Sequence, residues 1–263
     1  MFSQPVVFVI GAGASAELGL PTGTDMKARI ALSHNFNRDQ SGNLIGNRTI
    51  FDMLGARFGQ ESAIRQQQAT ELATRITEFE SIDEALHWFS AQPDPVAIGK
   101  AAIVWEILQA EHSSKLFNAQ NPEMIREINY NDTWVSYFLS MLVSSLRREQ
   151  TTDLFRNVTI INFNYDRTIE HFLFSRLQTN FGLNREEAGK ALSALNADMI
   201  RPYGSVGPLP WQQGQAAFRT AFFLALITRG YLDLLKTCAP IPSKTYLTRF
   251  DLILGTPSKM LAS

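Results

Sequence analysis

A glycine turn near the start of the chain carries the clearest chemical signal. Residues 11–16 read Gly-Ala-Gly-Ala-Ser-Ala and follow the apolar run Val6–Ile10. Gly11 and Gly13, with Ala16 as third member, fit the G-x-G-x-x-G/A spacing that lets a backbone approach a pyrophosphate at a helix N-terminus. The pattern predicts a dinucleotide site, with a tight turn that binds no ligand as the alternative.

Two polar residues stand where a second apolar run ends. Val158–Phe163 is followed by Asn164 and Asp166, which we expect at the carboxyl end of a parallel strand, where ligands bind in open α/β sheets. The amide of Asn164 can both donate and accept a hydrogen bond. The alternative for both residues is to cap the next helix, and the two roles are compatible.

Three motifs, in order, resemble those of the sirtuin family. Sirtuins carry G-A-G-x-S followed after three residues by G-I-P, and residues 11–21 have this spacing and end in Gly-Leu-Pro. Residues 162–166 (Asn-Phe-Asn-Tyr-Asp) stand where sirtuins carry T-Q-N-I-D, and 203–205 (Tyr-Gly-Ser) where they carry H-G-S. The whole pattern is most similar to bacterial sirtuin-like proteins, many of which are NAD-consuming defence effectors. The similarity covers residues 5–34 and 155–211.

The resemblance implies NAD as the bound nucleotide and an NAD glycohydrolase activity, which cleaves nicotinamide from NAD. Because the transition state of this cleavage resembles an oxocarbenium ion, the site must hold the ribose, stabilise positive charge and guide water. Asn164 is then catalytic, and Asp166 lies near the nicotinamide carboxamide. The residues implied in cofactor binding are Gly11, Ala12, Gly13, Ser15, Gly19, Pro21, Asn164, Asp166, Gly204 and Ser205. No metal site is expected.

The histidine that serves sirtuins as base is missing from its place. Tyr203 stands there, and its unperturbed pKa of about 10 makes it a poor base at pH 7. In a second alignment Arg201 occupies the position of the histidine, and an arginine cannot act as a base because it stays protonated. We expect Tyr203 to orient a ribose hydroxyl and Arg201 to bind a phosphate. Both are therefore predicted as catalytic residues, together with Asn164 and Asp166. The alternative is a catalytically impaired sensor or interaction protein that binds NAD or an ADP-ribose derivative.

The apolar runs and helical periodicities predict an α/β fold, a Rossmann-like parallel sheet with a large inserted helical layer. The first strand is expected to be buried, because neither of its faces alternates to polar residues. Residues 35–60 indicate an irregular connection, and 61–150 a helical insertion within a single sirtuin-like α/β domain over 1–263. The C-terminal segment 212–263 has no assignment, although a last strand is one option for 250–256.

Local signals mark the ends of individual helices. Thr22 or Thr24 is expected to cap a helix that ends near residue 32. Pro93 and Pro95 are expected to break the chain. Asn184 begins a capping pattern three residues before a glutamate, which predicts the start of another helix.

The composition limits the classes of binding partner and the cellular compartment that we expect. The net charge is −1 over 263 residues, and no basic stripe predicts nucleic-acid binding. The longest apolar stretch, 220–228, is too short to span a bilayer, so we expect no membrane partner and a cytoplasmic protein. The single cysteine, Cys238, cannot build the four-cysteine zinc module of protein-deacylating sirtuins, which argues against a deacylase. A homo-oligomer contact or an effector partner is expected through the helical insertion.

Overall fold

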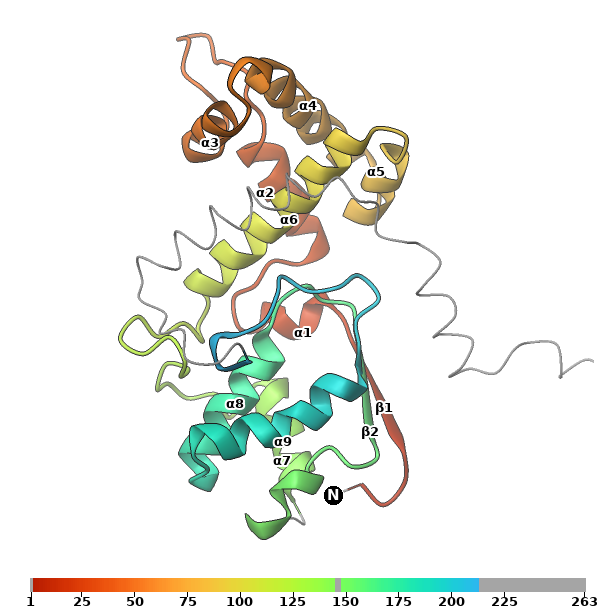
Figure 1. The fold of residues 1–263 in the computed structure, drawn as a ribbon, viewed down its shortest axis with the longest axis vertical. Helices are drawn as coiled ribbons and strands as arrows, with labels where there is room; N and C mark the ends of the chain where they lie inside the picture. The colour runs from red at the N-terminus through yellow and green to blue at the C-terminus, as the bar shows by residue number, and fades with distance from the viewer. Residues whose placement is uncertain (1, 145–147, 213–263) are drawn as a thin grey trace, which may run out of the picture.

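The computed structural model describes residues 2–144 and 148–212, in which a small parallel sheet is combined with a larger set of helices (Figure 1). The chain is therefore α/β, as its apolar runs predict. In chain order the elements are β1 (Val6–Ile10), α1 (Ala12–Ala16), α2 (Gly23–Ser33), α3 (Arg48–Phe58), η1 (Gly59–Glu61), α4 (Ser62–Arg75), η2 (Ile76–Glu78), α5 (Ile82–Trp88), α6 (Pro93–Ser113), α7 (Trp134–Val143), η3 (Arg148–Asp153), β2 (Val158–Asn162), α8 (Thr168–Phe181), α9 (Arg185–Asp198), β3 (Met199–Ile200) and η4 (Pro210–Gln212).

The described part of the sheet has three parallel strands in the order β1-β2-β3. Ile10 pairs with Asn162 at the end of the first two strands, and Ile161 pairs with Ile200. Parallel strands end at the same edge of their sheet, so the loops that follow β1, β2 and β3 leave from neighbouring points. The glycine turn at 11–16 and the segment 162–166 are brought together at this edge.

Burial along β1 differs from the expectation. Val7 and Val9 are 53% and 68% exposed, whereas Ile10 is buried, so the strand alternates between a covered and an open face. The prediction of a strand buried on both faces is wrong for the described part of the chain, in which β1 has one strand neighbour and the helices pack on one side of it. An apolar residue on a strand does not by itself require burial.

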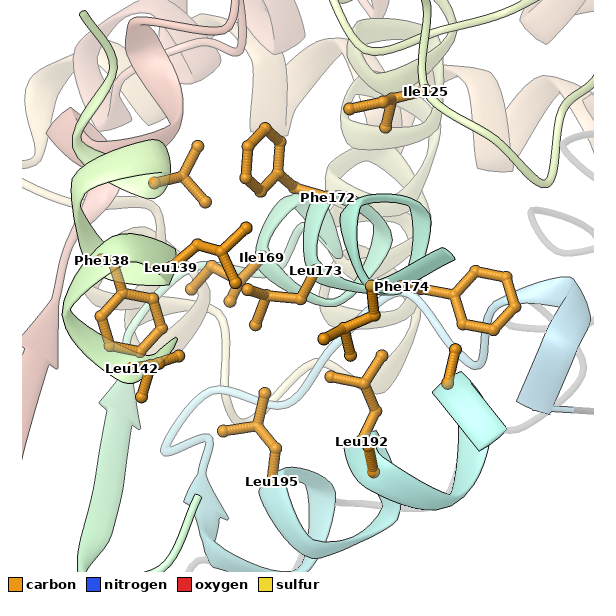
Figure 2. Packing of buried hydrophobic residues seen from close by; sticks show 14 of the residues in the cluster. Ile125, Phe138, Leu139, Leu142, Ile169, Phe172, Leu173, Phe174, Leu192 and Leu195 are labelled. Atoms are coloured by element: carbon orange, nitrogen blue, oxygen red, sulfur yellow. The ribbon is translucent and has the colours of Figure 1, made fainter. Parts of the chain in front are cut away.

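Three helices cover the other face of the sheet. Side chains from α7, α8 and α9 point toward one another and form one apolar cluster with β2 (Figure 2). Ile160 of β2 and Leu173 of α8 are fully buried in it, and the rings of Phe8 and Phe138 meet edge to face at 4.9 Å. Burying such side chains contributes about 1.5–3 kcal/mol each, which makes this cluster the platform that holds the strand ends in place.

The helices α2 to α6 form a second region beyond the carboxyl end of the sheet (Figure 1). Their buried apolar residues fall into two clusters. In the cluster nearest the sheet, Met26 of α2, Ile82 of α5 and Ile107 of α6 pack together, and Tyr165 and Val206 pack against them from the loops that follow β2 and β3. The helical region therefore rests directly on the loops at the strand ends.

The local sequence signals predicted most of the helix ends correctly. Thr22 caps α2 in a reciprocal capping box with Asp25, and Asn184 does the same for α9. Two expectations are wrong. The segment 35–60 contains α3, capped by the side chain of Asn47. Pro93 does not break the chain but begins α6, a position where a missing N–H has no cost.

One expectation on the ends of the chain falls on residues the structure does not describe. The segment beyond Gln212, with the optional strand at 250–256, lies outside the described residues. Over the described part of the chain, no helix combines the length and the apolar character needed to cross a bilayer.

Candidate active site

The glycine turn and the Asn-Tyr-Asp segment meet at one point. The amide nitrogen Nδ2 of Asn164 donates to the carbonyl oxygen of Gly11 at 3.0 Å and to Oγ of Ser15 at 3.1 Å. Asn164 is 7% exposed and Ser15 is 2% exposed. The contact follows from the sheet, because β1 and β2 are adjacent and end side by side. Two segments far apart in sequence thus form one site.

The orientation of the Asn164 amide is fixed by its partners. Gly11 offers a carbonyl oxygen, which only accepts, so the atom facing it is the amide nitrogen. The backbone is also held, because Asn164 N–H donates to Oδ1 of Asn162 at 2.9 Å. Both amide hydrogens are used, and no donor among residues 2–144 and 148–212 reaches Oδ1 of Asn164. That oxygen is left to accept a hydrogen bond from a ligand.

Asp166 is a buried acid that lies one residue before the N-cap of α8, which is Arg167 and has no side-chain cap hydrogen bond. Its Oδ1 accepts from the N–H of Thr168 at 3.0 Å, at the start of α8. Burial raises the pKa of Asp166, the Glu111 carboxylate adds to this, and hydrogen bonds from Thr168 and Ser15 act in the opposite direction. A raised pKa favours the protonated acid, which can donate a hydrogen bond as well as accept one.

Arg201 lies behind the site. Its Nη1 donates to the backbone carbonyls of Asn164 at 2.8 Å and Asp166 at 3.1 Å, and its Nη2 forms an ion pair with the buried Glu170. These contacts use the guanidinium group to hold the loop after β2. Arg201 does not line the cavity that Asn164 faces, so its geometry is that of a positioning residue.

The glycines of the three motifs differ in the structural reason for a glycine at their position. A Cβ added at Gly11 or Gly13 would meet no protein atom within 4 Å, and neither backbone is left-handed. Gly19 (φ 97°) and Gly204 (φ 84°) are left-handed, a conformation that other residues disfavour. Steric packing therefore does not require a glycine at any of these four positions. Backbone conformation favours glycine only at Gly19 and Gly204. The space beside Gly11 and Gly13 is open for the close approach of a ligand.

A cavity of about 320 Å³ lies between the strand ends and the helical region. This is near the lower end of the volumes of about 300–1,000 Å³ typical of ligand pockets. Of the residues expected at the site, Ala12, Pro21, Asn164, Asp166 and Tyr203 line it. The helical region adds Thr22, Gly23, Thr24, Met26, Glu80, Ser81, Ile82, Asp83 and Ile107, and the loop after β2 adds Phe163 and Tyr165.

Aromatic rings and one carboxylate shape the mouth of this cavity. Tyr203 is half-exposed, and its ring centroid lies 5.8 Å from that of Phe163 and 6.1 Å from that of Tyr165. The hydroxyl of Tyr165 donates to Oδ1 of Asp83 at 2.9 Å. Burial raises the pKa of Tyr165, and the Asp83 carboxylate raises it further, so the tyrosine keeps its proton as a donor. Asp83 and Tyr165 were both missed from the sequence.

The remaining expected residues lie elsewhere. Gly204 turns the chain after Tyr203, and Ser205 lines a separate cavity of about 910 Å³ next to Arg201 and Trp211. No histidine lines the cavity of Asn164. His171 lies on α8, where burial lowers its pKa to about 4. The described residues contain no group of three or more His, Cys, Asp or Glu side chains able to hold a metal ion.

Comparisons of the chain with protein-family models, with curated proteins and with solved structures find no match. The function is therefore argued from the geometry of the site.

Proposed function

We propose that this chain binds NAD in the cavity between the strand ends and the helical region, and that it hydrolyses the bond between nicotinamide and ribose. The observation that carries the proposal is the contact of Asn164 with Gly11 and Ser15 beside that cavity. We further propose that the sheet belongs to a Rossmann-like fold with a helical layer inserted between β1 and β2, which the parallel order and the glycine turn after β1 support.

Two features of the site support a dinucleotide. The open space beside Gly11 and Gly13 would admit a pyrophosphate to the backbone of the turn. The cavity itself combines apolar walls with a few polar groups, as small-molecule sites do. Its volume of about 320 Å³ suits the nicotinamide riboside half, with the rest of the dinucleotide along the glycine turn.

The polar groups have complementary tasks in hydrolysis. Asn164 Oδ1 would accept a hydrogen bond from a ribose hydroxyl or from the attacking water. Asp166, whose pKa burial raises, would donate to the carboxamide oxygen of nicotinamide. Tyr203 would contact the ribose from the cavity mouth. Arg201 would act through the backbone of Asn164 and Asp166, which it holds.

A second candidate function is binding of NAD or an ADP-ribose derivative without turnover. The observation that favours it is that none of the described residues lining the cavity is a histidine, so no imidazole is available as a base near neutral pH. Such a protein would act as a sensor, with the helical region free to dock a partner or a second copy.

Incubation of the full chain with NAD, with nicotinamide followed by chromatography and NAD affinity by calorimetry, tests the proposal. We expect nicotinamide release in the wild type and a loss of about 100-fold or more in Asn164→Ala, since a catalytic hydrogen-bonding group contributes this much. Asn131→Ala, at an exposed position that does not line the cavity, is the matched control.

The outcomes separate the two candidates. NAD binding without nicotinamide release would support the sensor, and no binding by a folded wild type would contradict both. If the chain hydrolyses NAD, its expression in bacteria should deplete cellular NAD, the activity expected of a defence effector. The single cysteine supports a reducing compartment, so the cytoplasm remains the proposed location.

A further inference from the structure

Asp83 is a carboxylate of the helical region that faces the strand ends. It lies in the first turn of α5 and lines the same cavity as Asn164 and Asp166. Its contact across the cavity is the hydrogen bond that Oδ1 accepts from Tyr165 at 2.9 Å. That bond ties Asp83 to the residue between Asn164 and Asp166, so the carboxylate is held next to the proposed reaction centre.

Among the described residues, Asp83 has no positively charged side chain as a partner, and its place in the first turn of α5 gives it only the partial positive charge of a helix N-terminus. The cap of α5 is made by Ser81, whose Oγ accepts from the N–H of Glu84 at 3.1 Å, so helix capping does not need Asp83. No cation among residues 2–144 and 148–212 forms an ion pair with it, and no donor in this part of the chain reaches its second oxygen, Oδ2. A half-buried carboxylate in a cavity that is also lined by aromatic rings is costly to keep without a positive partner.

We propose that Asp83 supplies the negative charge that holds the cationic nicotinamide–ribose end of NAD⁺ and stabilises positive charge on the ribose during cleavage. This inference rests on the proposed function. Tyr165 is the positioning residue, because its hydroxyl fixes Oδ1 and leaves Oδ2 for the ligand. The other charged or titratable groups that line this cavity are Glu80, Asp166 and Tyr203, and none of them is a cation. The ammonium group of Lys27, just outside the lining, donates to the backbone carbonyls of Phe79 and Glu80 and forms no ion pair with Asp83.

The chemical step needs no further reactant. The bond between ribose C1′ and the ring nitrogen breaks, and its electron pair neutralises the pyridinium ring. Water oxygen bonds to C1′ and releases a proton to solvent, which gives nicotinamide and ADP-ribose. Positive charge moves from the ring to the ribose as the bond breaks, so a fixed carboxylate in a partly buried site lowers the energy of this step.

The charge gives a test that does not depend on turnover. NAD⁺ carries a positive nicotinamide ring and NADH a neutral one, so the wild type should bind NAD⁺ about 10-fold more tightly than NADH, as one charge contact at a partly buried site allows. Asp83→Asn keeps the acceptor for Tyr165 but removes the charge, and should abolish this preference while NADH affinity is retained. Asp83→Glu should restore part of it.

Glu84→Gln is the matched control, because Glu84 lies beside Asp83 in the first turn of α5 but is exposed and does not line the cavity, and it should bind both nucleotides as the wild type does. Where nicotinamide is released, its rate should fall about 10-fold or more in Asp83→Asn. A folded Asp83→Asn variant that still prefers NAD⁺ would overturn the inference and leave the proposed function intact. A folded wild type that binds neither nucleotide would overturn the proposed function, and the inference with it.

Discussion

The two walls of the cavity are held together by different kinds of contact. The sheet wall, made of the turn 11–16 and residues 162–166, depends on contacts between segments distant in sequence, such as that of Asn164 with Gly11. The helical wall, made of residues 21–26 and 80–83, depends on bonds between residues three apart, such as that of Thr22 with Asp25. The helical wall adds these local caps to its tertiary packing, whereas the contacts that join the two halves of the sheet wall are all between distant segments.

This difference has an energetic consequence. Directly behind the sheet wall, Arg167 and Glu170 are buried charged groups, and a buried charge that loses its partner costs several kcal/mol. The caps of the helical wall lie near solvent, where losing one costs about 1 kcal/mol. Disruption of the sheet wall should therefore affect folding, whereas changes in the helical wall should affect mainly what the cavity binds.

The largest effect is expected from Arg201→Met. The change removes the partner of buried Glu170 and the donors to the carbonyls of Asn164 and Asp166. We expect the free energy of unfolding in urea to fall by about 3–5 kcal/mol. The double variant Arg201→Met/Glu170→Leu should recover much of this loss, because it leaves no unpaired buried charge.

Arg48→Met is the control for this variant. Arg48 pairs with Asp52 on the exposed surface of α3, and such pairs contribute about 0–1 kcal/mol. Equal losses for the two arginines would show that the sheet wall is not held by its buried ion pair and would remove the energetic half of the comparison.

The same difference decides what the sequence could predict. Thr22, Asn184 and the strand β2 were predicted, because a cap or an apolar run is written in neighbouring residues. The position of Asn164 at the carboxyl end of a parallel strand was also predicted, but its hydrogen bonds to Gly11 and Ser15 became visible only in the structure. Arg201 was expected to grip a phosphate, since nothing near it in sequence indicates that its partners are the carbonyls of the loop after β2.

The missed parts of the site have the same origin. Asp83 occurs in a pattern that signals only a helix start, and its place in the cavity depends on how the helical region rests on the loop containing Tyr165. The exposed face of β1 was missed because the sequence of a strand does not state how many neighbours cover it. The helix α3 was missed because its start depends on a cap by Asn47 that the surrounding polar residues concealed.

A smaller effect is expected on the stability of the fold at acidic pH. It depends on one buried histidine in the helical region and one in the sheet region. Burial lowers the pKa of His34, at the end of α2, and that of His171, on α8, to about 4. The unfolded chain therefore binds more protons than the folded one between about pH 6.5 and 4. Stability should be complete above this window and should fall as the pH is lowered through it, by about 2 kcal/mol per histidine at pH 5.

Urea unfolding across this pH range measures the effect. His34→Leu and His171→Leu should each reduce the loss of stability on acidification, and the double variant should reduce it further; the buried acids Asp166, Glu170 and Glu106, whose pKa values burial raises, act with the opposite sign. His87→Leu, at an exposed position of α5, is the control for the exchange of histidine for leucine itself. A pH dependence carried by one histidine alone would show that the two regions differ in how tightly they exclude water, which sharpens the comparison of the walls.

The smallest effect is expected at the local cap of the helical wall. Thr22→Ala removes both the acceptor for the N–H of Asp25 and the donor to its carboxylate, and should lower the free energy of unfolding by about 1 kcal/mol. Thr24→Ala is the matched control, because Thr24 lines the same cavity but lies inside α2, past the cap, and it should change stability little. A loss for Thr22→Ala as large as that for Arg201→Met would mean that the start of α2 also supports the sheet wall, since capping alone cannot supply so much.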